Sequence, residues 1–179
     1  VQYTLGAISK FKHELNENLT VEVGVDLRTA EIQHYRTVRE LLGGSGYQRS
    51  DSDFWGASGK VLQPGDKFAY NNTNTVNWLG AFAQGEYTKD QLSAYGMVGY
   101  SMINYSFEDF FKDDGSGNPY TIDSGNLNGL QVKGGTSYRV NDLVSVFGNA
   151  GYVSKVPIFD GVIDDVTGAK LEDPENETF

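Results

Sequence analysis

Side chains that could do chemistry are few in this sequence, and they are far apart. The two histidines, His13 and His34, fall on different predicted elements, and no cysteine is present. A chain without cysteine has no disulfide, no thiol nucleophile and no thiolate metal ligand. No serine stands in a G-x-S-x-G elbow, and the scattered acids form no recognisable pair. We therefore expect no catalytic residue, no metal site, no cofactor and no enzymatic activity.

One acidic segment has the composition of a calcium-binding loop. Residues 113–118 read Asp-Asp-Gly-Ser-Gly-Asn. An EF-hand loop carries acids at alternate positions and a glutamate at its end, and this segment has neither. An exposed turn is the better interpretation, with Asp113 and Asp114 kept as candidates for contact with a ligand.

Aromatic residues in the expected loops are the best candidates for binding. They alternate with amides and carboxylates, and aromatic faces beside such groups suit sugars, peptides or chelates. The alternative is that the rings only pack the loops together. The ligand-binding candidates are Phe54, Trp55, Phe68, Tyr70, Phe110, Phe111, Tyr120, Asp113 and Asp114.

Strands must position these residues, because apolar residues recur at every second position in much of the chain. Val21, Val23 and Val25 alternate with charged residues and glycine, which is the period of a half-buried strand. Six strands are expected, at about residues 3–15, 19–33, 75–88, 91–107, 127–139 and 143–153. Short polar turns are expected at residues 16–18, 89–90 and 141–142, and long loops at about 34–74, 108–126 and 154–179.

The loops contain weaker signals of their own. Apolar residues between Glu31 and Leu42 recur at near-helical spacing, which predicts a helical turn ended by Gly43 and Gly44. A small hairpin about Pro64-Gly65 is expected in the first loop, and another at residues 162–171.

Strand length and the alternation of short and long connections favour a membrane barrel. The expected strands exceed the globular mode of about five or six residues, and roughly 9–11 tilted residues cross a bilayer. Short turns on one side and long loops on the other are typical of outer-membrane barrels. We therefore predict an all-β, antiparallel, up-and-down transmembrane β-barrel segment.

The alternation also assigns residues to the two faces of the sheet. Tyr87 and Tyr138 lie beside short turns, where aromatic residues mark the membrane interface. The residues expected to face lipid are Leu130, Val132, Tyr138, Val144, Val146 and Tyr152. Those expected to face the lumen are Gln131, Lys133, Arg139 and Asn149.

Composition and charge exclude other classes of protein. The chain has 24 acids and 14 bases, a net charge of −10, and so lacks the basic footprint of a nucleic-acid-binding protein. Aromatic residues make up 13%, which is too many for a disordered chain. No apolar run is long enough for a transmembrane helix.

Several stretches resemble TonB-dependent outer-membrane receptors of the Bacteroidetes type. They are residues 34–44 (HYRTVRELLGG), 76–84 (VNWLGAFAQ) with 92–95 (LSAY), and 147–160 (FGNAGYVSKVPIFD) followed by 173–177 (DPENE). The resemblance implies a plugged barrel in the bacterial outer membrane that imports a scarce nutrient, such as a siderophore, glycan or peptide. It implies as partners membrane lipid, the TonB system, a plug domain and, in some receptors, a surface lipoprotein.

Six strands are too few to close a barrel, because known bacterial barrels have about eight or more. An open edge in lipid leaves backbone groups unpaired at several kcal/mol each. We therefore expect residues 1–179 to be an internal part of a longer barrel without its plug domain, and to associate edge to edge when isolated. The alternatives are a complete small outer-membrane barrel serving as an adhesin or structural protein, and a soluble ligand-binding barrel.

Overall fold

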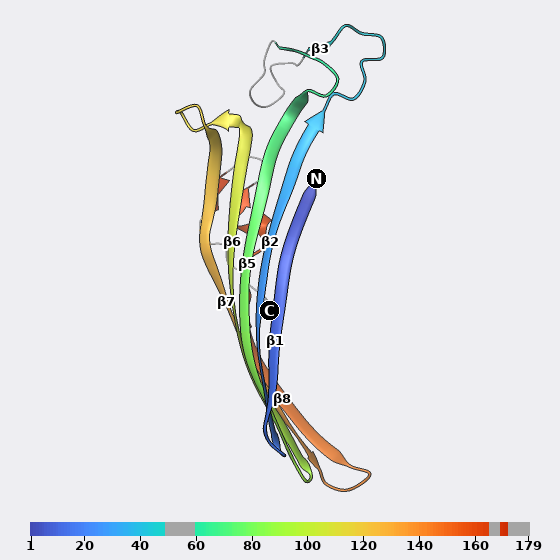
Figure 1. Cartoon of the computed structure of the whole chain (residues 1–179), viewed down its shortest axis with the longest axis vertical. Helices are drawn as coiled ribbons and strands as arrows, with labels where there is room; N and C mark the ends of the chain where they lie inside the picture. The colour runs from blue at the N-terminus through green and yellow to red at the C-terminus, as the bar shows by residue number, and fades with distance from the viewer. Residues whose placement is uncertain (49–59, 165–168, 172–179) are drawn as a thin grey trace.

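The computed structural model describes residues 1–48, 60–164 and 169–171, and consists almost entirely of β-strands (Figure 1). Six long strands form one antiparallel sheet in the order β1-β2-β5-β6-β7-β8. The up-and-down topology predicted from the sequence is therefore confirmed. The strands are β1 (Gln2–Asn16), β2 (Leu19–Thr37), β5 (Lys67–Lys89), β6 (Leu92–Asp113), β7 (Pro119–Arg139) and β8 (Ser145–Ser154).

Four shorter strands pair outside the main sheet. β3 (Tyr47–Gln48) pairs with β4 (Val61–Leu62), and β9 (Ile163–Asp164) pairs with β10 (Ala169–Lys170). A 3₁₀ turn, η1 (Phe159–Gly161), precedes β9. Within the described ranges, no helix has both the length and the apolar character needed to cross a membrane.

All three tight turns lie at one end of the sheet, and the other connections lie at the opposite end (Figure 1). Two of the turns are closed by asparagine side chains that accept hydrogen bonds from their own main chain. Asn16 Oδ1 accepts from the N–H groups of Asn18 and Leu19, at 2.9 and 3.0 Å. Asn141 Oδ1 does the same in the connection between β7 and β8. The predicted separation of turns and loops is therefore confirmed.

Several loop predictions are wrong because the strands continue further than expected. The predicted loop at 108–126 is strand on both sides, and only residues 114–118 connect β6 to β7. The first loop shortens to residues 38–66. No helical turn forms between Glu31 and Leu42, since β2 stays paired with β5 as far as Thr37. A short isolated helix is marginal in water, whereas each further residue of a strand adds to a ladder that already exists.

Of the two small hairpins predicted in the loops, the first forms only in part and the second forms as predicted. The Pro64-Gly65 turn forms, with the Asp66 N–H donating to the Gln63 carbonyl at 3.0 Å. The strand before that turn, β4, pairs with β3 rather than folding back onto β5. The hairpin predicted at 162–171 is confirmed in the pairing of β9 with β10.

The main sheet is open. β1 and β8 are its edge strands, and the described residues form no closed barrel (Figure 1). The chain exposes 12331 Å² of surface, against roughly 8,600 Å² expected for a compact monomer of this mass. Both faces of the sheet therefore stand largely uncovered.

Strand register determines which side chains share a face, because directly opposed residues of an antiparallel pair point the same way. We call one side the apolar face. Its central row crosses all six strands as Phe11, Val23, Ala83, Val98, Val132 and Tyr152. The neighbouring row on the opposite side, which we call the polar face, contains Lys12, Glu22, Gln84, Met97, Lys133 and Gly151.

The apolar face has a continuous band without Asp, Glu, Lys or Arg. Along β2 this band runs from Leu19 to Thr29, and the residues paired with this stretch on the other strands are uncharged as well. Its side chains are exposed: Phe11 to 63%, Val132 to 45% and Tyr152 to 63%. A soluble monomer rarely exposes an apolar patch of this extent.

Glycines on the two faces should respond differently to an added methyl group. On the polar face the Phe82 ring lies over Gly24, where a Cβ would overlap it, whereas nothing lies within 4 Å of a Cβ at Gly85 on the apolar face. We expect Gly24→Ala to destabilise the protein by about 1–3 kcal/mol through overpacking. Gly85→Ala should be neutral or stabilising, because alanine loses less backbone entropy on folding.

Urea unfolding followed by tryptophan fluorescence measures both variants. Equal effects of the two substitutions would contradict the packing of Phe82 over Gly24.

Candidate functional site

The polar face carries a pocket of about 430 Å³ near the middle of the sheet. The pocket is hollow because the residues at its base have small side chains or none. They are Gly80, Ser101 and Gly129, paired across three strands, and Gly99 in the next row. Larger side chains surround this floor, namely Trp78, Phe82, Met97, Gln131, Val153 and Lys155.

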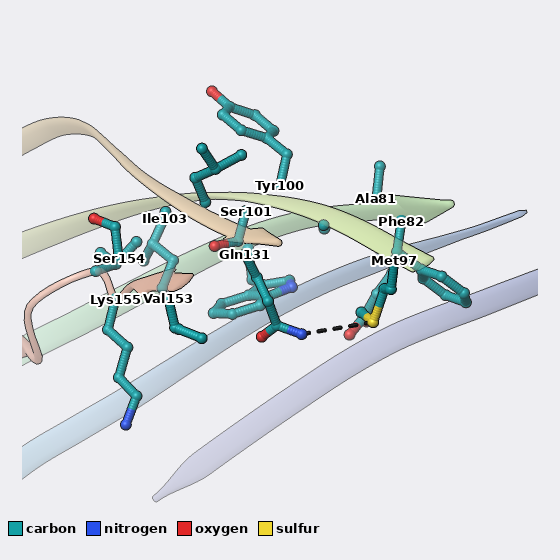
Figure 2. A pocket seen from close by; sticks show the side chains of 17 residues that line it. Ala81, Phe82, Met97, Tyr100, Ser101, Ile103, Gln131, Val153, Ser154 and Lys155 are labelled. Carbon is teal, nitrogen blue, oxygen red and sulfur yellow. Dashed lines mark hydrogen bonds between the residues drawn. The ribbon is translucent and has the colours of Figure 1, made fainter. Parts of the chain in front are cut away.

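Figure 2 shows how the strands divide their side chains around this pocket. Gln131, Met97 and Lys155 extend to one side of the sheet, whereas Tyr100 and Ala81 extend to the other. Gln131 Nε2 donates a weak hydrogen bond to the Met97 sulfur at 3.7 Å. The Gln131 amide is therefore held only loosely and has capacity for a stronger partner.

The four residues predicted to face the lumen share the polar face. Gln131, Lys133 and Arg139 lie on β7, and Asn149 lies opposite Gly135 on β8. The residues predicted to face lipid lie on the apolar face: Leu130, Val132 and Tyr138 on β7, and Val146 and Tyr152 on β8. Val144 differs, because it lies in the connection before β8 begins.

Trp78 forms one wall of the pocket. Its indole Nε1 is buried without a hydrogen-bond partner, as is Asn74 Oδ1 on the same face. A Cβ at Gly80 would lie 3.0 Å from that nitrogen, so the indole sits directly over the glycine. An unsatisfied buried donor costs about 1–3 kcal/mol, a cost that the packing around Trp78 must offset.

Charges on the polar face are arranged in pairs near the pocket. The Arg28 guanidinium donates to both carboxylate oxygens of Asp26, with Nε to Oδ1 at 2.8 Å. Lys10 Nζ lies 3.7 Å from Glu22 Oε1 on the neighbouring strand. This face therefore has the chemistry of a surface in contact with water or with polar protein.

The segment after β8 folds back over the upper part of the polar face. Val162 and Ile163 are fully buried against Ile103, Tyr105 and Phe107 of β6. The Tyr105 hydroxyl donates to the Pro157 carbonyl at 3.1 Å. This cluster is the main buried core of the described chain, and it borders the pocket.

A second group of candidate residues lies at the loop end of the sheet. The Arg36 guanidinium carbon is 5.9 Å from the centre of the Phe68 ring and 5.4 Å from that of Tyr70. Lys67 Nζ is 4.5 Å from the centre of the Tyr35 ring. We call Tyr35, Arg36, Lys67, Phe68 and Tyr70 the loop-end cluster. A hollow of about 330 Å³ adjoins it at Phe68.

The remaining aromatic candidates do not join this cluster. Phe110 and Phe111 lie near the end of β6, and Lys112 Nζ is 4.2 Å from the centre of the Tyr120 ring at the start of β7. Phe54 and Trp55 lie outside the described residues. The described members of the predicted set are thus divided between the β2–β5 end and the β6–β7 end rather than brought into one site.

Sequence reasoning missed Tyr35, Arg36 and Lys67. The sequence predicts loop over residues 34–74, and this prediction omits the pairing of β2 with β5 there. Only this pairing brings Arg36 opposite Phe68. The available signal was the alternation of Phe68 and Tyr70 at every second position, which is a strand period.

In the part of the chain that the structure describes, no three His, Asp or Glu side chains lie close enough together to hold a metal ion. His13 and His34 lie towards opposite ends of the sheet. No family model matches the chain, and no similar curated protein or solved structure was found. The resemblance to TonB-dependent receptors therefore stays a prediction.

Asp113 ends β6, and Asp114 begins the turn that leads to β7. The Asp114 carboxylate accepts hydrogen bonds from the backbone N–H groups of Ser116, at 2.7 Å, and Asn118, at 3.3 Å. The Ser116 N–H is the larger cause that holds the pKa of Asp114 below its ordinary value. This geometry explains the acidic segment as a self-bonded turn.

The lowered pKa of Asp114 predicts a pH dependence. A carboxyl group whose pKa is depressed by folding stabilises the folded state above its unfolded pKa of 3.8, and that stabilisation is lost as the pH falls through the folded pKa. The stability difference between the wild-type protein and Asp114→Asn should therefore be constant above about pH 5 and vanish in stronger acid. Thermal unfolding of both proteins across this range measures the difference, and a difference that persists unchanged in strong acid would contradict the assignment.

Proposed function

We propose that this chain forms part of the wall of a bacterial outer-membrane β-barrel, of the TonB-dependent transporter kind, that takes up a scarce nutrient. In this proposal the apolar face contacts lipid, the polar face lines the lumen, and the loop end lies outside the cell. The chain binds and guides its substrate without catalysing a reaction. A plug domain and the TonB system would act through other parts of the protein.

The observation that carries the proposal is the uncharged band on the apolar face. Along β2 the band from Leu19 to Thr29 is about 33 Å long, at roughly 3.3 Å per residue. At the usual tilt of about 40° it covers about 25 Å along the membrane normal, which matches the apolar belt of outer-membrane barrels. Tyr87 and Tyr138 stand at its turn end, where interfacial aromatic residues are expected.

A soluble barrel is the weaker alternative. Such a barrel would keep its apolar face inside and its charged face in water. That arrangement requires this sheet to curl around the apolar face, with Phe11 and Tyr152 of the two edge strands enclosed. Both are exposed to 63%, and the buried hydrophobic cluster found among the described residues lies on the other face, at Ile103, Tyr105 and Phe107.

A complete small barrel is also less well supported. The described residues supply six long strands with two open edges, and each edge must find a partner in lipid. The short strands β3, β4, β9 and β10 have only two residues each, too few to cross a bilayer. Further strands from the same or another polypeptide would be needed to complete the barrel.

Substitutions on adjacent residues of β7 test the proposal. Val132→Arg places a charge on the apolar face and should lower stability in lipid by about 2–4 kcal/mol if it lies near the bilayer centre. Lys133→Ala, on the polar face one residue away, is the matched control and should change stability much less. The measurement is urea unfolding of the protein refolded in lipid vesicles. If Lys133→Ala is the more harmful change, the polar face is the one that meets lipid.

A further inference from the structure

We propose that the loop-end cluster binds a ligand in which a carboxylate is attached to a ring, with Arg36 pairing with the carboxylate and Phe68 and Tyr70 contacting the ring. This inference rests on the proposed function, because it names the substrate class of the site that would lie outside the cell. Three observations support it. Aromatic rings rather than acids hold the Arg36 guanidinium, β5 is distorted at Ala69, and cations outnumber acids around the hollow among the described residues.

The Arg36 guanidinium is positioned by aromatic rings rather than by acids. Its central carbon lies within 6 Å of the centres of both Phe68 and Tyr70, a distance at which a cation is attracted to the ring face. Among the described residues, Arg36 makes no hydrogen bond and no ion pair, and it is exposed. Its planar fork of donors is therefore oriented but unused, and such a fork fits a carboxylate through two parallel hydrogen bonds.

A distortion of β5 creates this arrangement. Tyr35 pairs with Asn71, but the next residue, Arg36, pairs with Phe68, so Ala69 and Tyr70 are left without partners. Ala69 adopts φ 66°, in the left-handed region, which is unfavourable for a residue with a Cβ. Strain of this kind persists only where the surroundings impose it, and it concentrates at ligand sites. Here the bulge brings two rings to a single cation.

The hollow beside Phe68 has the size and charge for a small anion with a ring. Its volume of about 330 Å³ is at the lower end for ligand pockets, which suits one sugar or one aromatic ring rather than an oligomer. Arg39 and Glu40 both line it. Arg36 and Lys67 lie beside it and Asp66 precedes Lys67, so three cations stand against two acids among the described residues here, although the whole chain has a net charge of −10.

Lys67 supports the same cation-rich surface. Its ammonium group lies 4.5 Å from the centre of the Tyr35 ring and donates to Asn71 Oδ1 at 2.7 Å. It therefore stays in place without a neutralising acid. Two fixed cations beside three aromatic rings select ligands in two ways. The cations favour a carboxylate over an uncharged group, and the ring faces favour a ligand that contains a ring over a short acid.

The test compares probes that differ in one feature at a time. Isothermal titration is performed on the intact protein extracted from its native membrane into detergent. Glucuronate is compared with glucose, benzoate with benzamide, and both acids with acetate. We expect each ring-bearing acid to bind at least about tenfold more tightly than its uncharged analogue, because the Arg36 fork pairs with the carboxylate. We expect a similar preference over acetate, because acetate has no ring to contact Phe68 and Tyr70. Whether glucuronate or benzoate binds more tightly identifies a sugar acid or an aromatic acid as the natural class.

Variants separate the roles of the cation and the rings. Arg36→Gln should weaken both acids at least about tenfold, and Arg36→Lys should recover only part of the loss because it lacks the fork. Phe68→Leu should weaken glucuronate and benzoate but not acetate. Lys112→Gln is the matched control, because it removes a cation from the Tyr120 ring at the neighbouring hairpin end and should leave binding unchanged.

Two further measurements distinguish failure of the inference from failure of the proposed function. Heat-dependent migration on a gel and recovery in the membrane fraction show whether the protein is a folded membrane barrel. If the folded barrel binds none of the probes, binds glucose as well as glucuronate, or is unaffected by Arg36→Gln, the inference is overturned and the proposed function stands. If the protein is absent from the membrane, the proposed function fails, and binding by the soluble protein would still test the cluster.

Discussion

The register between neighbouring strands is the constraint on which the rest of this structure depends. Backbone hydrogen bonds hold Val23 opposite Phe11 on one side and Ala83 on the other, and the same alignment continues across the sheet to Val132 and Tyr152. Because side chains alternate with a period of two, a slip of one residue in any pair would move a whole strand's apolar residues to the charged face. The uncharged band, the small-residue floor of the pocket and the face of every candidate residue all follow from that alignment.

The asparagine-closed turns help to set this register. Asn16 and Asn141 satisfy turn N–H groups locally, so two of the three hairpins begin at a defined residue. Aromatic rings reinforce it on the polar face, where Phe82 lies over Gly24 and Tyr95 over Gly135. A slip of two residues, which keeps the rings on the same face, would place Phe82 against Glu22 or Asp26 and Tyr95 against Lys133 or Ser137. Register is therefore specified both at the turns and in the middle of the strands.

The sequence was sufficient for the sheet and insufficient for the sites. Alternation from Val21 to Leu27 and short polar turns are local signals, so strand order, turn placement and the opposite faces of Val132 and Lys133 were predictable. The extension of β2 past residue 33 and the start of β5 at Lys67 rather than near residue 75 were not predictable, since polar residues such as Asn71 carry no apolar alternation and are held by the existing ladder. The contact of Arg36 with Phe68 depends on a bulge at Ala69, a distortion that no sequence period indicates. Alanine at a positive φ even contradicts the usual preference for glycine.

The central claim is that the face with Leu130 and Val132 meets lipid and the face with Gln131 and Lys133 meets water. The chain has no cysteine, so a cysteine introduced at each of these four positions in turn gives a unique site for a nitroxide label. In lipid vesicles, the collision rates of each label with oxygen, which concentrates in lipid, and with a water-soluble nickel chelate measure its surroundings. The account predicts preferential collision with oxygen at 130 and 132 and with the chelate at 131 and 133. The opposite alternation, or free access of the chelate to all four positions, would contradict it.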